Sequence, residues 1–202
     1  WYYTLRFCNE NEIKNILIRR GYFAEDVRKY PVELILKEIL IDEVYDVLDE
    51  YLSTHPEIKI PRGFMNTEEV LELQHSGLVE VGAHTMIHPI LKAEDDIRAR
   101  KEIVESVDKL SEILDKKVTS FAYPNGIENV DYSVRDEQIA KEAGINMAFS
   151  VDPGIITSKT NPLSVPRWGS MARLKFGRFG MYLPSRANQS KQRKEIRKFK
   201  LQ

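Results

Sequence analysis

The stretch LVEVGAHTMIHPIL, residues 78–91, changes character in its middle. Its first half is apolar and ends in small residues, which predicts a buried strand over 78–83. His84 and His88 follow directly, and the whole chain of 202 residues holds four histidines. Because two of the four stand together where an apolar run stops, we expect them to share a function.

Helix and strand patterns alternate around this stretch. Apolar periodicity, capping residues and turn signals predict helices over 66–77, 94–114 and 133–144, and strands over 78–83, 117–123, 145–151 and 161–169. Each predicted strand is short and apolar enough to be buried on both faces. This alternation is typical of parallel βα units and indicates an α/β fold.

The residues before this pattern predict a helical region. The segment PVELILKEILIDEVYDVLDEYL, residues 31–52, has the periodicity of one long helix or of two helices with a break. Residues 55–63, HPEIKIPRG, are expected to form a connector. We therefore divide the chain into a helical region over 1–65, a core over 66–171 and a C-terminal extension over 172–202.

The C-terminal extension is strongly basic. It carries ten Lys or Arg residues and one acidic residue, Glu195, although the net charge of the whole chain is −1. Such a segment could contact a polyanion or an acidic membrane surface, or it could be a solvated extension, which we favour. Without a recognisable nucleic-acid-binding fold, it does not indicate a nucleic-acid partner.

The bulk composition is that of an ordinary globular protein, with 42% apolar and 30% charged residues. No apolar run approaches the roughly 18 residues of a membrane helix. The single cysteine, Cys8, excludes an internal disulfide framework but does not fix the compartment.

Polar residues follow each of the first three predicted strands, at the end where parallel α/β folds bind ligands. His84 follows the first strand, Asn125 the second and Asp152 the third. Histidines at i and i+4 can ligate one metal ion, each through a ring nitrogen. The alternative is a pair of polar residues that are hydrogen-bonded in a loop. Two ligands do not complete a catalytic zinc site, which usually has three protein ligands and a water.

Two segments resemble motifs of a known family. LVEVGAHTMIHPIL is similar to the His-Ser/Thr-x-x-His metal motif of the polysaccharide deacetylases, the NodB-homology domain of carbohydrate esterase family 4. KKVTSFAYPNG, residues 116–126, is similar to the next motif of that family, a strand that ends in an aromatic-Pro-x-Gly turn. The resemblance covers Thr67 to Gly169, about half of the chain.

The resemblance implies a distorted (β/α) barrel in which a divalent metal, Zn²⁺ before others, activates water. That water removes an acetyl group from an N-acetylated sugar or polysaccharide, or in some members an O-acetyl group. By this resemblance His84 and His88 are metal ligands, and the backbone N–H of Asn125 stabilises the oxyanion. Tyr123 and Pro124 belong to the substrate-binding turn.

The chain lacks the first motif of the family. That motif contains an Asp pair that supplies the general base and the third metal ligand. Asp95 and Asp96 form the one Asp pair in this sequence, but they stand where a helix is expected to begin. The opening WYYTLRF resembles the region after the family's second strand, so we expect two strands and both carboxylates to precede Trp1. An incomplete barrel follows from this, and the alternative is an inactive domain that binds a glycan or a protein partner.

Two further departures concern the reaction centre. Where many members have an Arg that orients the catalytic Asp, this chain has Ala122. Arg167 could reach the same centre from the last strand, or it could be a surface residue beside Trp168. The family's late His, a general acid, has no counterpart, because no histidine follows His88.

Overall fold

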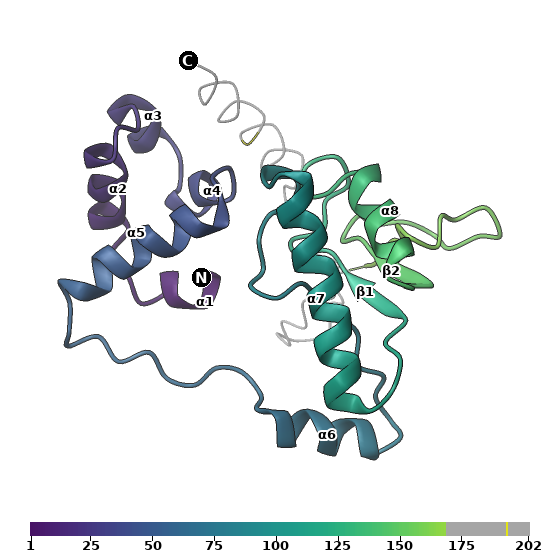
Figure 1. Cartoon of the computed structure of the whole chain (residues 1–202). Coiled ribbons are helices and arrows are strands. Elements are labelled where there is room, and N and C mark those ends of the chain that lie inside the picture. The colour runs from purple at the N-terminus through teal and green to yellow at the C-terminus, as the bar shows by residue number, and fades with distance from the viewer. Residues whose placement is uncertain (169–192, 194–202) are drawn as a thin grey trace, which may run out of the picture.

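The computed structural model describes residues 1–168 and residue 193 (Figure 1). Its buried apolar side chains form two clusters. The first, called here the helical core, is built from residues 1–51, and the second, called the α/β core, from residues 83–148. In the part of the chain that the structure describes, no helix is both long and apolar enough to cross a membrane.

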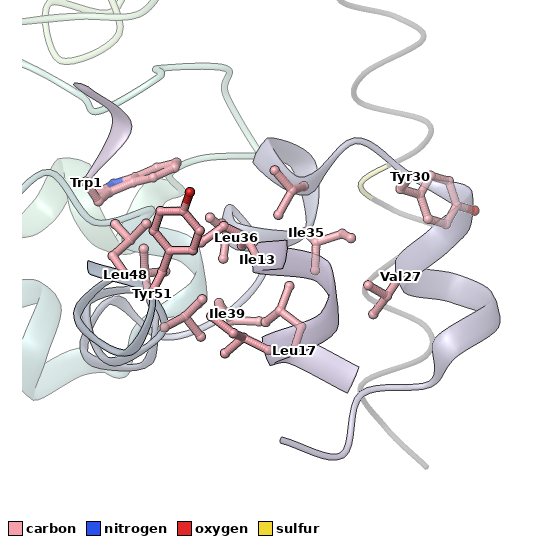
Figure 2. Close-up of a cluster of buried hydrophobic side chains, with 14 of the residues drawn as sticks. Trp1, Ile13, Leu17, Val27, Tyr30, Ile35, Leu36, Ile39, Leu48 and Tyr51 are labelled. Atoms are coloured by element: carbon pink, nitrogen blue, oxygen red, sulfur yellow. The ribbon is translucent and has the colours of Figure 1, made fainter. Parts of the chain in front are cut away.

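Short helices build the helical core. They are α1 (Tyr2–Leu5), α2 (Glu10–Arg19), α3 (Ala24–Lys29), α4 (Val32–Leu36) and α5 (Ile41–Ser53). Figure 2 shows Ile13 and Leu17 of α2 gathered in one cluster with Leu48 and Tyr51 of α5. The spacing of four residues between Ile13 and Leu17 places both side chains on the same face of α2.

The apolar stretch over 31–52 forms two helices with a break, which is one of the two predicted alternatives. Pro31 immediately precedes α4, as expected from the preference of proline for helix starts. At the start of α5, the N–H of Ile41 donates a hydrogen bond of 2.8 Å to the carboxylate of Glu94. Because Glu94 precedes the long helix of the α/β core, this bond fixes the start of α5 against that core.

The connector and the helix after it match the prediction. Residues 55–63 contain no helix or strand, and α6 (Thr67–His75) follows. The side chain of Asn66 accepts the Glu69 N–H at 2.9 Å, and the Glu69 carboxylate accepts the Asn66 N–H at 2.8 Å. This reciprocal pair is a capping box, and Gly77, at φ +71°, follows the end of the helix.

Two helices lie against each other in the α/β core, α7 (Asp96–Leu114) and α8 (Val134–Glu142) (Figure 1). The predicted apolar stripe of α7 packs into this core and consists of Ile103, Val107, Leu110 and Leu114. The predicted stripe is confirmed, because residues at this spacing lie on one face of the helix and all four pack into the same core.

The Asp pair belongs to the start of α7, as the sequence indicated. The side chain of Asp95 accepts the backbone N–H of Arg98 at 2.7 Å and caps the helix. Asp96 pairs with Arg135 at 3.0 Å. Both carboxylates therefore have structural roles at the positive end of the helix dipole.

A small parallel sheet joins β1 (Ser120–Ala122) to β2 (Met147–Phe149), with Phe121 opposite Ala148. Parallel bridges extend it on both sides, from Ala83 to Phe121 and from Phe149 to Val165. The four chain segments therefore run in the same direction in sequence order. This arrangement confirms the α/β class, while both strands are shorter than predicted.

The predicted strand over 78–83 is wrong in extent, because it is reduced to a single bridging residue, Ala83. Leu78 is 90% exposed and Val79 is 41% exposed, so this segment is not buried on both faces. The Ala83 N–H donates to the Ser120 carbonyl at 2.9 Å. Pairing with β1 thus begins only at the last residue of the apolar run.

The predicted last strand over 161–169 is also wrong in extent, since Val165 alone forms a bridge within its described residues. Pro162 and Pro166 flank this position. A proline has no N–H to donate, so the ladder cannot be extended in the regular way at either position.

Candidate active site

The ends of the parallel segments bring the predicted residues to one edge of the sheet. His84 directly follows Ala83, and the turn with Asn125 follows β1. The Nδ1 atom of His84 lies 2.6 Å from the carbonyl oxygen of Ala122, the last residue of β1. The first histidine is therefore held against the strand that carries the second motif.

This contact fixes the proton on the His84 ring. A carbonyl oxygen can only accept, so Nδ1 must carry the proton and donate it to Ala122. In the neutral ring, Nε2 then keeps a free lone pair. A histidine that binds a metal through one nitrogen and donates a hydrogen bond from the other has this arrangement.

The residues from His84 to His88 form a tight loop rather than a helical turn. Thr85 and His88 have φ values of +64° and +62°, which are uncommon for residues with a side chain. The Thr85 hydroxyl donates to the His84 carbonyl at 2.5 Å and accepts the His88 N–H at 3.1 Å. Thr85 therefore orients the loop, and the two imidazole ring centroids lie 4.9 Å apart.

Burial lowers the pKa of both histidines. For His88, burial is the largest cause and the neighbouring His84 adds to it, so that the pKa falls to about 4. For His84, burial by surrounding protein atoms also lowers the pKa, although its hydrogen bond to Ala122 opposes this effect. Both rings are therefore neutral near pH 7, which is the form that ligates metals.

The ring of His88 contains an unsatisfied atom. Its Nδ1 is buried and has no hydrogen-bond partner among the described residues. An unpaired buried polar atom is costly, and a cation held by the histidine pair would relieve that cost. The pair therefore fits a divalent metal, although within residues 1–168 and at 193 no group of three His, Cys, Asp or Glu side chains is placed to hold one.

The turn after β1 has a strained backbone. Asn125 and Gly126 have φ values of +57° and +75°, and the Gly126 N–H donates to the Pro124 carbonyl at 2.6 Å. A Cβ atom on Gly126 would lie 3.0 Å from the carbonyl oxygen of Tyr123, so only glycine fits without displacement. In the described structure, the Asn125 backbone N–H has no hydrogen-bond acceptor, and its side-chain Nδ2 is buried without a partner.

Tyr123 lies in the α/β core. Its side chain is 1% exposed, its hydroxyl donates to the Leu163 carbonyl at 2.9 Å, and its ring stacks on Tyr132 with centroids 3.7 Å apart. Pro124 is also buried. The role of Tyr123 and Pro124 in a substrate-binding turn stays a prediction.

Arg167 stands close enough to the pair to act on it electrostatically. Its charge contributes to the lowered pKa of His84. Its Nε donates to the Ser150 carbonyl at 2.6 Å, and its guanidinium lies 5.7 Å from the ring centroid of Phe149. The position of Arg167 is therefore fixed by the end of β2.

Other residues that the sequence did not single out also contact the histidine loop. The indole Nε1 of Trp1 donates to the His88 carbonyl at 3.0 Å. The carboxylate of Glu102, on α7, accepts the N–H groups of Met86 and Ile87. The signal for Glu102 was its position next to Ile103 on the apolar face of α7, where a charged residue is unexpected.

Known proteins resemble this chain to different degrees. The deacetylase domain of BpsB from Bordetella bronchiseptica is 24% identical, with 55% of this chain and 52% of that chain covered and a TM-score of 0.47. The deacetylase PplD from Streptococcus pyogenes, in complex with acetate, is 20% identical, with 77% of each chain covered and a TM-score of 0.47. The chain thus spans about half the length of the Bordetella domain. No curated protein matches it.

The sequence model of one family, described as polysaccharide deacetylase, matches residues 37–148. This match covers more than half of the chain and includes both histidines, β1 and the turn after it. The chain therefore belongs to the polysaccharide deacetylase family.

Proposed function

We propose that the protein removes acetyl groups from an N-acetylated sugar or polysaccharide by metal-dependent hydrolysis, with O-acetylated sugars as the alternative substrate. The observation that carries this proposal is the histidine pair. Two neutral imidazoles lie with ring centroids 4.9 Å apart, one with its proton fixed on Nδ1 and the other with an unsatisfied buried nitrogen. Family membership supplies the reaction class.

His84 and His88 would hold the divalent metal, with Zn²⁺ as the first choice for imidazole ligands. When bound, such a cation lowers the pKa of water and polarises a carbonyl group. The Ala122 carbonyl keeps the His84 ring in its orientation through Nδ1. Thr85 keeps the loop closed, with the two ring centroids 4.9 Å apart.

The backbone N–H of Asn125 would stabilise the oxyanion of the acetyl carbonyl during attack. Asn125 has a left-handed φ of +57°, and its N–H has no acceptor among the described residues. A preorganised donor of this kind stabilises negative charge that develops in the transition state. Arg167, fixed by the Ser150 carbonyl, would orient acidic groups near His84.

The remaining acidic ligand and the general base would come from outside the described residues. If they are absent from the functional protein, the same site would serve an inactive deacetylase-like domain that binds a glycan or a protein partner. Binding of an N-acetylated glycan without release of acetate would distinguish it from the enzyme.

The organisation of the chain follows the same proposal. Residues 1–65 would form a helical region, residues 66–171 the deacetylase core and residues 172–202 a basic extension. The parallel segments from Ala83 to Val165 would be part of a distorted (β/α) barrel. Most of the basic extension lies outside the described residues, so its contact with a polyanion or membrane surface stays a prediction.

Acetate release tests the proposed function. The protein, produced at its natural full length, should release acetate from N-acetylated oligosaccharides, and a chelator should abolish release until Zn²⁺ is restored. His84→Ala should remove the activity, and His75→Ala, at the end of α6, should retain it. Acetate release that is unchanged after chelation would contradict metal dependence.

A further inference from the structure

The middle of the histidine loop needs hydrogen-bond acceptors. Thr85 satisfies the His88 N–H and the His84 carbonyl, which closes the loop on itself. The N–H groups of Met86 and Ile87 lie between these two ends and point out of the loop. Their acceptor decides where the backbone between the two imidazoles is held.

One oxygen of Glu102 accepts both of these N–H groups. Its Oε2 lies 3.0 Å from the Met86 nitrogen and 3.1 Å from the Ile87 nitrogen. The other oxygen, Oε1, lies 3.4 Å from Nε of Arg98, one turn earlier on α7. Both N–H groups of the loop are therefore attached to α7 through one side chain.

Burial of the Glu102 carboxylate costs free energy, which its contacts must offset. Its side chain is 4% exposed and lies on the buried face of α7, beside Ala99 and Ile103. A buried carboxylate loses hydration, and its hydrogen bonds must compensate for that loss. An apolar residue at this position would continue the stripe of α7, but it would leave two loop N–H groups without an acceptor.

We propose that Glu102 is a positioning residue for the metal site, which acts by fixing the backbone between His84 and His88. This inference rests on the proposed function, because it assigns the loop to metal binding. It adds a carboxylate that does not touch the metal but sets the spacing of the two ligands. Loss of such outer hydrogen bonds typically weakens metal affinity about 10- to 100-fold.

Two substitutions separate the effect of side-chain length at position 102 from the effect of its charge. Glu102→Gln keeps the side-chain length and an acceptor oxygen but removes the charge, whereas Glu102→Asp keeps the charge but shortens the side chain by one methylene group. We expect Glu102→Gln to bind Zn²⁺ nearly as tightly as the wild type. Glu102→Asp should bind Zn²⁺ about 10- to 100-fold more weakly.

Glu94→Asp is the matched control. Glu94 is also buried, and it accepts a backbone N–H, that of Ile41, which lies outside the histidine loop. The same shortening should therefore lower thermal stability without changing Zn²⁺ affinity. Amide hydrogen exchange provides a second measurement: Glu102→Asp should accelerate exchange at Met86 and Ile87, and Glu94→Asp should not.

The full chain should be titrated with Zn²⁺ against a low-affinity chromophoric chelator. Equal Zn²⁺ affinity for Glu102→Asp and wild type would overturn the positioning role while leaving the proposed function in place. Weak binding by Glu102→Gln together with wild-type binding by Glu102→Asp would also overturn it, since charge rather than position would then matter. Absence of binding in the wild type would overturn the proposed function, and the positioning role with it.

Discussion

The Nδ1 atom of His84 donates a hydrogen bond of 2.6 Å to the carbonyl oxygen of Ala122. This bond joins the first residue of the histidine loop to the last residue of β1. It leaves Nε2 of His84 as the ring nitrogen with a lone pair. Two segments that are nearly forty residues apart in the sequence are thereby joined.

The tautomer of His84 can be observed directly. In metal-free protein near pH 7, we expect the His84 ring to carry its proton on Nδ1, because the Ala122 carbonyl accepts that proton. Long-range ¹H–¹⁵N correlation spectra of the imidazole nitrogens would report it. A proton on Nε2 in the metal-free state would contradict this assignment of the ligand atom.

Replacement of Arg167 should affect turnover more than substrate binding. Arg167→Ala removes a positive charge that is fixed by the Ser150 carbonyl and acts on His84. We expect kcat to fall by up to about a hundredfold, because misplaced groups act on the transition state rather than on the bound substrate. Arg62→Ala, on an exposed ion pair with Glu69, is the control. An effect confined to KM would count against the orienting role.

Replacement of Gly126 should destabilise the turn. Gly126→Ala places a Cβ 3.0 Å from the Tyr123 carbonyl oxygen and 3.2 Å from the Val151 nitrogen, at a φ of +75°. We expect the free energy of unfolding in urea to fall by about 2–3 kcal/mol. Gly21→Ala provides the comparison, because its φ is also positive, +98°, but nothing lies within 4 Å of the added atom. Equal losses of unfolding free energy for Gly126→Ala and Gly21→Ala would show that the close contacts of the added Cβ do not affect stability.

Replacement of Arg193 should destabilise the whole protein. Its guanidinium is 2% exposed and pairs with Glu38, beside α4, and with Asp131, in the α/β core. Arg193→Ala would remove the positive charge that pairs with two buried carboxylates, at a cost of about 3–5 kcal/mol in unfolding free energy. Arg62→Ala should cost far less, since its ion pair is exposed. Matching denaturation midpoints for the two variants would refute the role of Arg193.

Features that depend on neighbours in the sequence could be predicted well. The capping box of α6, formed by Asn66 and Glu69, joins residues three positions apart. The stripe of α7, which includes Ile103 and Val107, repeats at helical spacing. Such patterns are visible in the sequence because one helical turn brings these residues together.

Features that depend on distant contacts could be predicted only in part. The sequence indicated that His84 and His88 lie at a strand end, but the left-handed φ of Thr85 depends on a closed loop that Glu102 holds from α7. The strand over 78–83 was predicted from its apolar pattern. Its length depends on pairing partners, and Ala83 alone forms a bridge. Arg193 belongs to a segment interpreted as solvated, yet two buried carboxylates contact it.

Zinc stoichiometry of the full chain tests the central claim most directly. By isothermal titration calorimetry, the wild type and His75→Ala should bind one Zn²⁺ per chain, because His75 lies at the end of α6 and outside the histidine loop. His84→Ala and His88→Ala should each lose this binding, since either change removes one of the two imidazoles. If both variants keep one Zn²⁺ per chain while remaining folded, the histidine pair is not the metal site.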